Sequence, residues 1–173
     1  CLNTGCVPSK ALLHSARVAA AFSKAAESGV QSESVPEVDF PAVMQRMRQL
    51  RAKISENDSA ERFSRLGVDV LFGTAEFTGP KSVSVEGTQI AFKRAILATG
   101  ARPRMPTIPD LKKINVLTSE NVFSLDTLPP RLGIIGGGPI GCELAQAFAR
   151  FGSAVTLLHS KAGILPREDP DAA

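Results

Sequence analysis

The chain has 173 residues, of which 43% are hydrophobic and 21% charged, and its formal net charge is +3. This composition is typical of a globular protein large enough to bury a core. The charge is too small, and its signs too evenly mixed, to favour nucleic acid or an anionic membrane as a partner. Apolar stretches are shorter than a membrane span. Three cysteines are too few for a secreted disulfide scaffold, so we expect a cytoplasmic setting.

Two of the cysteines, Cys1 and Cys6, open the chain in the stretch CLNTGCVPSK. In a regular helix, residues five apart have Cα atoms roughly 8 to 9 Å apart, whereas a disulfide needs less than about 7 Å. A bridged pair therefore requires non-helical backbone, which Gly5 and Pro8 permit. The spacing favours a redox pair; a metal site without further His or Cys ligands and two inert thiols are the alternatives. Cys142 is interpreted as a small core residue.

Apolar residues at helical spacing predict two helices in the first part of the chain. The first runs from Ser9 to about Ala26 and ends at Gly29. The second begins at Pro41 and reaches about Leu66. Its expected apolar stripe consists of Val43, Met47, Leu50 and Ile54.

The pattern then becomes extended, which predicts a small β block. The expected strands are VDVLFG, SVSVEG, TQIAF and RAILATG, at 68–73, 82–87, 88–92 and 94–100. A proline-rich exit follows, and a connector over residues 112–130 separates two domains. The predicted division is residues 1–111, the connector 112–130, and residues 131–173.

The clearest unit is a strand, LGIIG, followed by a helix, GGPIGCELAQAFARFG, and a second strand, SAVTLLHS. The turn between them carries Gly136, Gly138 and Gly141 as GxGxxG. Glycines let the backbone turn tightly and approach a pyrophosphate, which rests against the positive end of the helix. Because the motif follows a strand and opens a helix, we predict a dinucleotide site, with a plain tight turn as the alternative.

Sites that prefer NAD usually carry Asp or Glu about twenty residues after the glycines, where it holds the ribose hydroxyls. Here that position reads LLHSK and holds His159. The absent carboxylate removes repulsion of a 2′-phosphate, and Lys161 or Arg167 would attract it. The sequence therefore favours NADPH over NADH, unless these residues are ordinary solvated loop charges.

CLNTGCVPSK resembles the redox segment of the flavin-dependent pyridine nucleotide-disulfide oxidoreductases, the family of dihydrolipoamide dehydrogenase, glutathione reductase and mercuric reductase. LFGTAEFTG, RAILATGARP, IPDL, IIGGGPIGCELA and LPREDPD follow in the order that family has them. The resemblance implies an α/β fold with two Rossmann-like three-layer domains, one for FAD and one for NAD(P)H, in a homodimer. The chain is then an internal piece, with the later part of the FAD domain and the start of the NAD(P) domain.

The resemblance also implies roles for individual residues. Cys1 matches the thiol that exchanges with substrate, and Cys6 the thiol beside the flavin. Lys10 matches the lysine near the flavin N5, and Glu143 its carboxylate partner; a solvated Lys10 and a surface Glu143 are the alternatives. The remaining positions expected to bind FAD or the pyridine nucleotide are Ala75, Ala98, Thr99, Gly100, Gly136, Gly137, Gly138, Pro139, Ile140, Gly141, His159 and Lys161.

The activity implied is transfer of electrons between NAD(P)H and a small-molecule disulfide, thiol or mercuric acceptor, through FAD and a Cys1–Cys6 disulfide. No resident metal is expected. The sequence leaves open whether the parent enzyme is closest to dihydrolipoamide dehydrogenase, mercuric reductase or glutathione reductase. A non-enzymatic redox sensor or nucleotide-binding protein is the alternative class.

Overall fold

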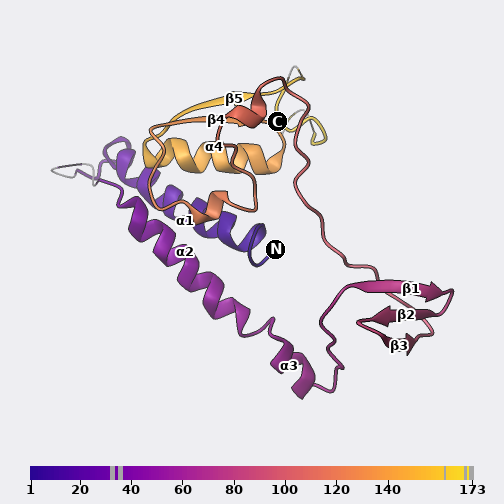
Figure 1. The fold of residues 1–173 in the computed structure, drawn as a ribbon. Helices are drawn as coiled ribbons and strands as arrows, with labels where there is room; N and C mark the ends of the chain where they lie inside the picture. The colour runs from indigo at the N-terminus through magenta and orange to yellow at the C-terminus, as the bar shows by residue number, and fades with distance from the viewer. Residues whose placement is uncertain (32–33, 35–36, 162, 170, 172–173) are drawn as a thin grey trace. The chain divides into compact units, whose positions relative to one another are not determined.

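The computed structural model describes residues 1–31, 34, 37–161, 163–169 and 171. They form two compact units, one made of residues 1–54 and 108–173 and the other of residues 55–107. Helices and both parallel and antiparallel strand pairs are present (Figure 1), which confirms the α/β class. Among the described residues, no helix is long and apolar enough to cross a membrane.

Two long helices carry the N-terminal part of the first unit. Helix α1 (Cys6–Ser23) continues through the short 3-10 helix η1 (Ala25–Ser28), and Gly29 follows with a left-handed φ of 77°. Glycine adopts this φ without steric cost, so it ends the helical stretch as predicted. Helix α2 (Phe40–Ser55) starts within one residue of its predicted beginning.

The prediction of one continuous helix to about Leu66 is wrong. Helix α2 ends at Ser55, and a separate helix, α3 (Ala60–Arg65), follows in the second unit. Ser59 has extended backbone, and its Oγ accepts a hydrogen bond from the backbone N–H of Arg62 at 3.2 Å. A serine side chain that bonds a free helix-start N–H stabilises a new N-terminus, so it favours a break here.

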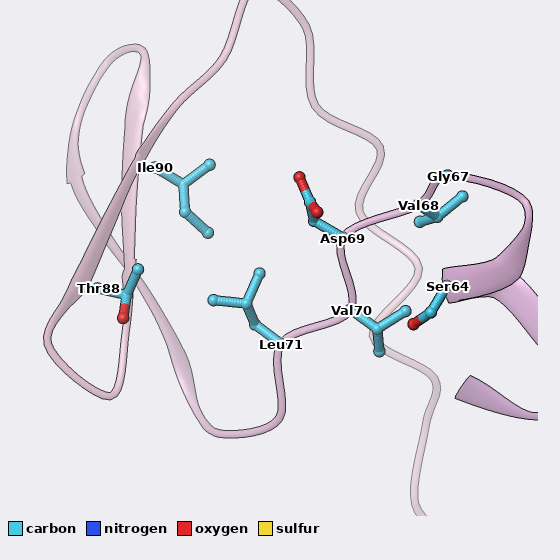
Figure 2. A pocket seen from close by; sticks show the side chains of 8 residues that line it. All are labelled: Ser64, Gly67, Val68, Asp69, Val70, Leu71, Thr88 and Ile90. Carbon is cyan, nitrogen blue, oxygen red and sulfur yellow. The ribbon is translucent and has the colours of Figure 1, made fainter. Parts of the chain in front are cut away.

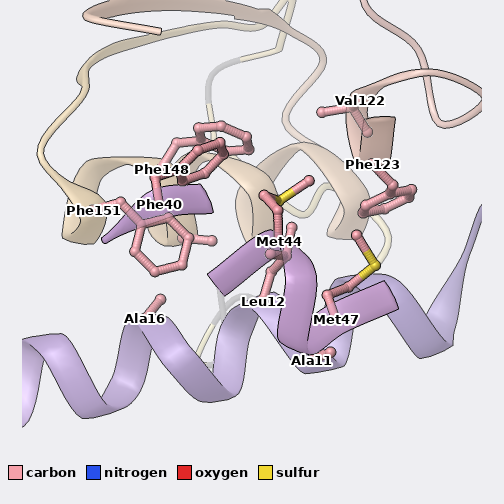
Figure 3. Close-up of a cluster of buried hydrophobic side chains, with 11 residues drawn as sticks. Ala11, Leu12, Ala16, Phe40, Met44, Met47, Val122, Phe123, Phe148 and Phe151 are labelled. Atoms are coloured by element: carbon pink, nitrogen blue, oxygen red, sulfur yellow. The ribbon is translucent and has the colours of Figure 1, made fainter. Parts of the chain in front are cut away.

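The core of the first unit lies where α1, α2 and the C-terminal helix α4 (Pro139–Phe151) meet (Figure 3). Phe40 packs its ring against Phe148 and Phe151, each with ring centroids 5.9 Å apart. The buried set is Ala11, Leu12, Ala16, Phe40, Met44, Met47, Val122, Phe123, Ala147, Phe148 and Phe151. Each Å² of apolar surface removed from water stabilises the folded state by about 25 cal/mol. Because this cluster holds most of the buried hydrophobic residues of the unit, it is the unit's main stabilising feature.

The predicted stripe on α2 is only partly right. Met47 is fully buried, and Val43 and Leu50 pack half-buried against the core, but Ile54 is 37% exposed. Met44 is buried instead. The buried residues of α2 therefore lie in its first half, and its first residue, Phe40, contacts the aromatic side chains of α4.

The predicted strand, turn, helix and strand are confirmed at the C-terminal end. Strands β4 (Arg131–Ile135) and β5 (Ala154–Leu158) pair in parallel, with α4 between them in the chain. Gly152 caps α4 with a φ of 110°. Two short 3-10 helices, η2 (Leu111–Lys113) and η3 (Val122–Ser124), precede β4 in the chain, and η3 contributes to the core.

The second unit contains a three-stranded antiparallel sheet. Its strands, β1 (Ala75–Gly79), β2 (Ser82–Val85) and β3 (Thr88–Ala91), follow one another in sheet order. The antiparallel block is therefore confirmed, and β2 and β3 fall within predicted strands.

The other two predicted strands, 68–73 and 94–100, are wrong, because neither segment forms a strand here. Their apolar side chains are exposed, with Ile96 at 93% and Leu97 at 72%. A β-strand needs a neighbouring strand for its backbone hydrogen bonds. The described residues pair neither segment with one, so the alternating pattern alone does not produce a strand.

A hollow of about 730 Å³ lies in the second unit (Figure 2). Leu71, in the extended segment after α3, and Ile90, on β3, line it from different parts of the chain. None of the residues predicted to bind a cofactor lines this hollow. The division of the chain into domains at 111 and 131 stays a prediction.

Candidate active site

The N-terminal turn brings Cys1 and Cys6 together. Their Sγ atoms lie 3.1 Å apart, and both residues are exposed. Residues 1–5 lie outside helix α1, and Gly5 has φ −147° and ψ −123°. The N–H of Val7 donates to the carbonyl oxygen of Cys1 at 3.2 Å, which closes the turn. The backbone between the cysteines is therefore non-helical, and a pair of thiols stands within reach of a disulfide bond of about 2 Å.

Lys10 lies one helical turn after Cys6, so both side chains share one face of α1. Its Nζ forms an ion pair with Glu143 of α4. The lysine side chain is 61% exposed and the glutamate side chain 29%. Exposed ion pairs contribute little to the free energy of unfolding. The main effect of this contact is therefore to fix the position of the lysine charge.

A hollow of about 450 Å³ adjoins the thiol end of α1. It lies between α1 and α2, and three of its lining residues, Lys10, His14 and Arg46, have polar side chains. The lining residues are Cys6, Val7, Lys10, Ala11, His14, Arg46, Leu50 and Ile54. Cys6 thus faces a concave surface rather than bulk water alone.

The glycine turn before α4 combines a left-handed glycine, a close approach of helix and strand, and open space before the helix. Gly136 has a φ of 119°, which side-chain-bearing residues rarely adopt. A Cβ on Gly141 would lie 1.9 Å from the carbonyl oxygen of Gly136, so helix and strand approach closely. A Cβ on Gly138 would meet nothing within 4 Å. That open space lies before the first turn of α4, whose N–H groups have no partner within the helix.

Pro139 occupies the first turn of α4, where its missing N–H costs nothing. Ile140 is 65% exposed beside it. The role of these residues and of the three glycines toward a dinucleotide stays a prediction.

His159 follows β5 directly and lies over the glycine turn. Its Nδ1 accepts a hydrogen bond from the N–H of Gly137 at 3.1 Å. A Cβ on Gly137 would lie 2.9 Å from the ring carbon Cγ, so the imidazole covers this peptide. The ring nitrogen Nε2 is buried and has no hydrogen-bond partner among the described residues. Lys161 is exposed nearby in the chain.

Two contacts to the carbonyl group of the same residue, Gly137, were not predicted. The carbonyl oxygen of Gly137 accepts a hydrogen bond from the N–H of Leu165 at 2.7 Å and lies 3.6 Å from Sγ of Cys142. Leu165 has a φ of 51°, uncommon for a bulky residue. No local signal marks Leu165. Cys142 follows the third glycine, and a thiol can donate a weak hydrogen bond at that position.

The remaining predicted FAD contacts lie in the second unit. Ala75 is the first residue of β1, paired with Val85. Ala98, Thr99 and Gly100 form an exposed segment without regular structure, and Gly100 has a φ of 73° with open space beside it. Small residues with open space permit close approach of a ligand to the backbone. The roles of these residues toward FAD stay predictions.

The family model for pyridine nucleotide-disulphide oxidoreductases matches residues 1–173. The chain belongs to this family. Its members use FAD and a pyridine nucleotide, and the relatives with assigned names are enzymes.

Named relatives carry more than one activity. A mercuric reductase of Lysinibacillus sphaericus is 34% identical over 99% of this chain and 31% of its own length. A dihydrolipoyl dehydrogenase of Acholeplasma laidlawii is also 34% identical, over 99% of this chain and 52% of its own. The chain thus spans about a third to a half of these relatives.

Among solved structures, the Cu(II) complex of the HOCl-induced flavoprotein disulfide reductase RclA from Escherichia coli is 33% identical, with a TM-score of 0.78. The match covers 99% of this chain and 35% of RclA. Both the sequence and the backbone therefore place the chain in one family whose members differ in electron acceptor.

Proposed function

We propose that the full-length protein passes electrons from NAD(P)H, with NADPH preferred, through FAD to the Cys1–Cys6 pair and on to a disulfide or mercuric-type acceptor. The observation that carries the proposal is the pair of exposed thiols with sulfur atoms 3.1 Å apart at the start of α1. Two thiols at this separation close to a disulfide with little motion, and their exposure admits a substrate.

The two cysteines have separate roles in the reductive direction. Two electrons and two protons open the Cys1–Cys6 disulfide to two thiols. The Cys1 thiolate then attacks a substrate disulfide, which forms a mixed disulfide and releases one substrate thiol. Cys6 attacks the Cys1 sulfur, which restores the internal disulfide and releases the second substrate thiol. A mercuric-type acceptor instead takes up the two electrons of the reduced pair. The two thiols then form the disulfide again and release two protons.

FAD, when bound, would supply the chemistry that converts a hydride from the nicotinamide into the two electrons that a disulfide accepts. Lys10 is proposed to place its positive charge at that ring from the same face of α1 as Cys6. Glu143 holds the lysine there through its ion pair. Ala75, Ala98, Thr99 and Gly100 are proposed to bind the remainder of FAD through close backbone contact. The lysine charge favours added electron density on its neighbour.

The glycine turn is proposed to bind the electron donor. Gly138 leaves open space in front of the first turn of α4, where the pyrophosphate rests. His159 and Lys161 stand at the end of β5 in place of a carboxylate, which favours a 2′-phosphate.

NADPH consumption by the full-length protein tests the proposal. We expect consumption with either a small disulfide or Hg²⁺ as acceptor, and its loss in both Cys1→Ser and Cys6→Ser. The acceptor that supports turnover assigns the substrate class. A redox sensor instead predicts one reduction of the pair without turnover. Unchanged turnover in both variants would reject the Cys1–Cys6 pathway.

A further inference from the structure

The backbone amides of the glycine turn fall into two groups. The N–H groups of Gly136 and Gly137 donate to acceptors at the end of β5, at 2.8 and 3.1 Å. The N–H of Gly138, in contrast, has no acceptor within the part of the chain that the structure describes. The amides in the first turn of α4 also lack partners within the helix. The free amides therefore lie where the pyrophosphate is proposed to bind.

The carbonyl group of Gly137 is held by the loop that follows β5. Its oxygen accepts a hydrogen bond from the N–H of Leu165 at 2.7 Å. The thiol of Cys142, with Sγ at 3.6 Å from the same oxygen, is a second and weaker donor. In a trans peptide the C=O and the N–H that follows it point in opposite directions. Fixing the Gly137 carbonyl therefore fixes the direction of the Gly138 N–H, which points away from the loop.

Leu165 makes this contact in a backbone conformation that a leucine rarely adopts. Its φ is 51°, in the left-handed region, and Pro166 restricts its backbone further. Its carbonyl oxygen accepts from the N–H of Glu168 at 2.9 Å, which closes a turn on the other side. An unfavourable φ persists only where surrounding contacts determine it, and such residues concentrate at functional sites. The unusual φ and the hydrogen bond to Gly137 are thus two observations at one residue.

We propose that Leu165 is a positioning residue for the electron donor. Its backbone N–H holds the Gly137 carbonyl, and this bond directs the Gly138 N–H at the pyrophosphate. Leu165 acts through the peptide and does not itself contact the nucleotide. Its effect concerns the pyrophosphate, which NADH and NADPH share, and not the phosphate that distinguishes them. The inference rests on the proposed binding of the donor at this turn.

Three substitutions separate the backbone of Leu165 from its half-buried side chain. Leu165→Pro removes the N–H, and its ring fixes φ near −65°. Leu165→Ile keeps the apolar volume and the N–H, but a β-branched side chain disfavours a positive φ. Leu165→Asn removes the apolar side chain, yet it keeps the N–H and readily adopts the left-handed φ. The asparagine variant is therefore the matched control for the other two.

Calorimetry on the full-length protein with its flavin bound tests the proposal, with ADP and AMP as probes. The two nucleotides differ only in the second phosphate, so the ratio of their affinities measures recognition of the pyrophosphate. We expect wild type to bind ADP more tightly than AMP. Leu165→Pro and Leu165→Ile should lower the affinity for ADP about fivefold, the effect of one misaligned hydrogen bond, and leave AMP affinity within about twofold. Leu165→Asn should keep the wild-type ratio.

A residue that only stabilises the loop would give a different result. Its loss would weaken the binding of ADP and AMP together, and Leu165→Asn would be affected as much as Leu165→Pro. Either outcome would overturn the proposal, as would a wild-type ratio in both Leu165→Pro and Leu165→Ile. Thermal unfolding shows whether each variant is folded, and Leu165→Ile carries the test if Leu165→Pro does not fold.

Failure here and failure of the proposed function are distinguishable. If wild type prefers ADP and the Leu165 variants keep that preference, the nucleotide site stands and the positioning role is wrong. If the ratio changes as expected but NADPH does not reduce the flavin, the positioning role stands and the electron pathway fails. Equal binding of ADP and AMP by wild type overturns both the inference and the proposed site.

Discussion

Lys10 of α1 and Glu143 of α4 form an ion pair between residues that lie 133 positions apart in the chain. The lysine shares a helix face with Cys6, and the glutamate lies two residues beyond the last glycine of the nucleotide turn. The pair therefore joins the helix that begins at Cys6 to the helix that begins at the nucleotide turn. It fixes the position of a positive charge one helical turn from Cys6.

Removing the pair should affect electron transfer more than stability. We expect Lys10→Met and Glu143→Gln each to lower the free energy of unfolding by less than about 1 kcal/mol, because the lysine is exposed. Each should slow flavin reduction by NADPH about tenfold, the effect of one lost charged interaction. Stopped-flow absorbance of the full-length protein measures the rate.

The double variant and a second ion pair complete this test. Lys10→Met combined with Glu143→Gln should be no slower than Lys10→Met alone, because the glutamate acts through the lysine. Arg48 of α2 forms an ion pair at 2.6 Å with Asp126, which lies outside that helix. Arg48→Met therefore removes a second ion pair and should leave the rate unchanged. Additive slowing, or equal slowing by Arg48→Met, would contradict the assigned role.

The aromatic cluster predicts a large stability cost at its centre. Phe148 has no exposed surface and contacts the ring of Phe40. Phe148→Ala should lower the free energy of unfolding by about 3 to 5 kcal/mol. Phe148→Leu keeps most of the volume and should cost less than about 2 kcal/mol. Urea denaturation followed by circular dichroism measures both, and equal costs would show that no cavity forms.

Two glycines of the nucleotide turn should respond differently to the same added methyl group. Gly141→Ala places a Cβ 1.9 Å from the Gly136 carbonyl oxygen, so backbone must shift at a cost of at least about 2 kcal/mol. Gly138→Ala meets nothing within 4 Å and should retain stability. The methyl would lie where the pyrophosphate is proposed to bind, so NADP⁺ affinity should fall. Calorimetry and thermal unfolding give the two values, and a stable Gly141→Ala would refute the close approach.

The sequence predicted best what depends on neighbouring residues. The strand, turn and helix around Gly136 follow from local signals, with Pro139 inside the helix start and Gly152 after its end. The start of a separate helix after Ser59 also has a local signal, since a serine is a favourable N-cap. The apolar stripe instead favoured one continuous helix, so the break was not predicted. Strand formation at Leu97 needs a partner strand, which a pattern in one segment cannot provide.

The candidate site shows the same distinction. Cys1 and Cys6 approach one another through a short turn. Their spacing favoured a redox pair and indicated that a bridged pair requires non-helical backbone, whereas the disulfide itself was implied by the family resemblance. The ring of His159 reaches Gly137 across 22 residues and through one side-chain rotamer. Composition at the end of β5 indicated a missing carboxylate, but it could not show that the imidazole caps the turn.

The central claim, that Cys1 and Cys6 act as a redox pair with distinct roles, is tested most directly by anaerobic titration of the full-length protein with NADPH. The visible spectrum should gain a long-wavelength charge-transfer band when the pair is reduced. Cys6→Ser should lack the band because it lacks the thiolate beside the flavin, whereas Cys1→Ser should retain it. A band that survives in Cys6→Ser, or is absent only from Cys1→Ser, would contradict the assignment.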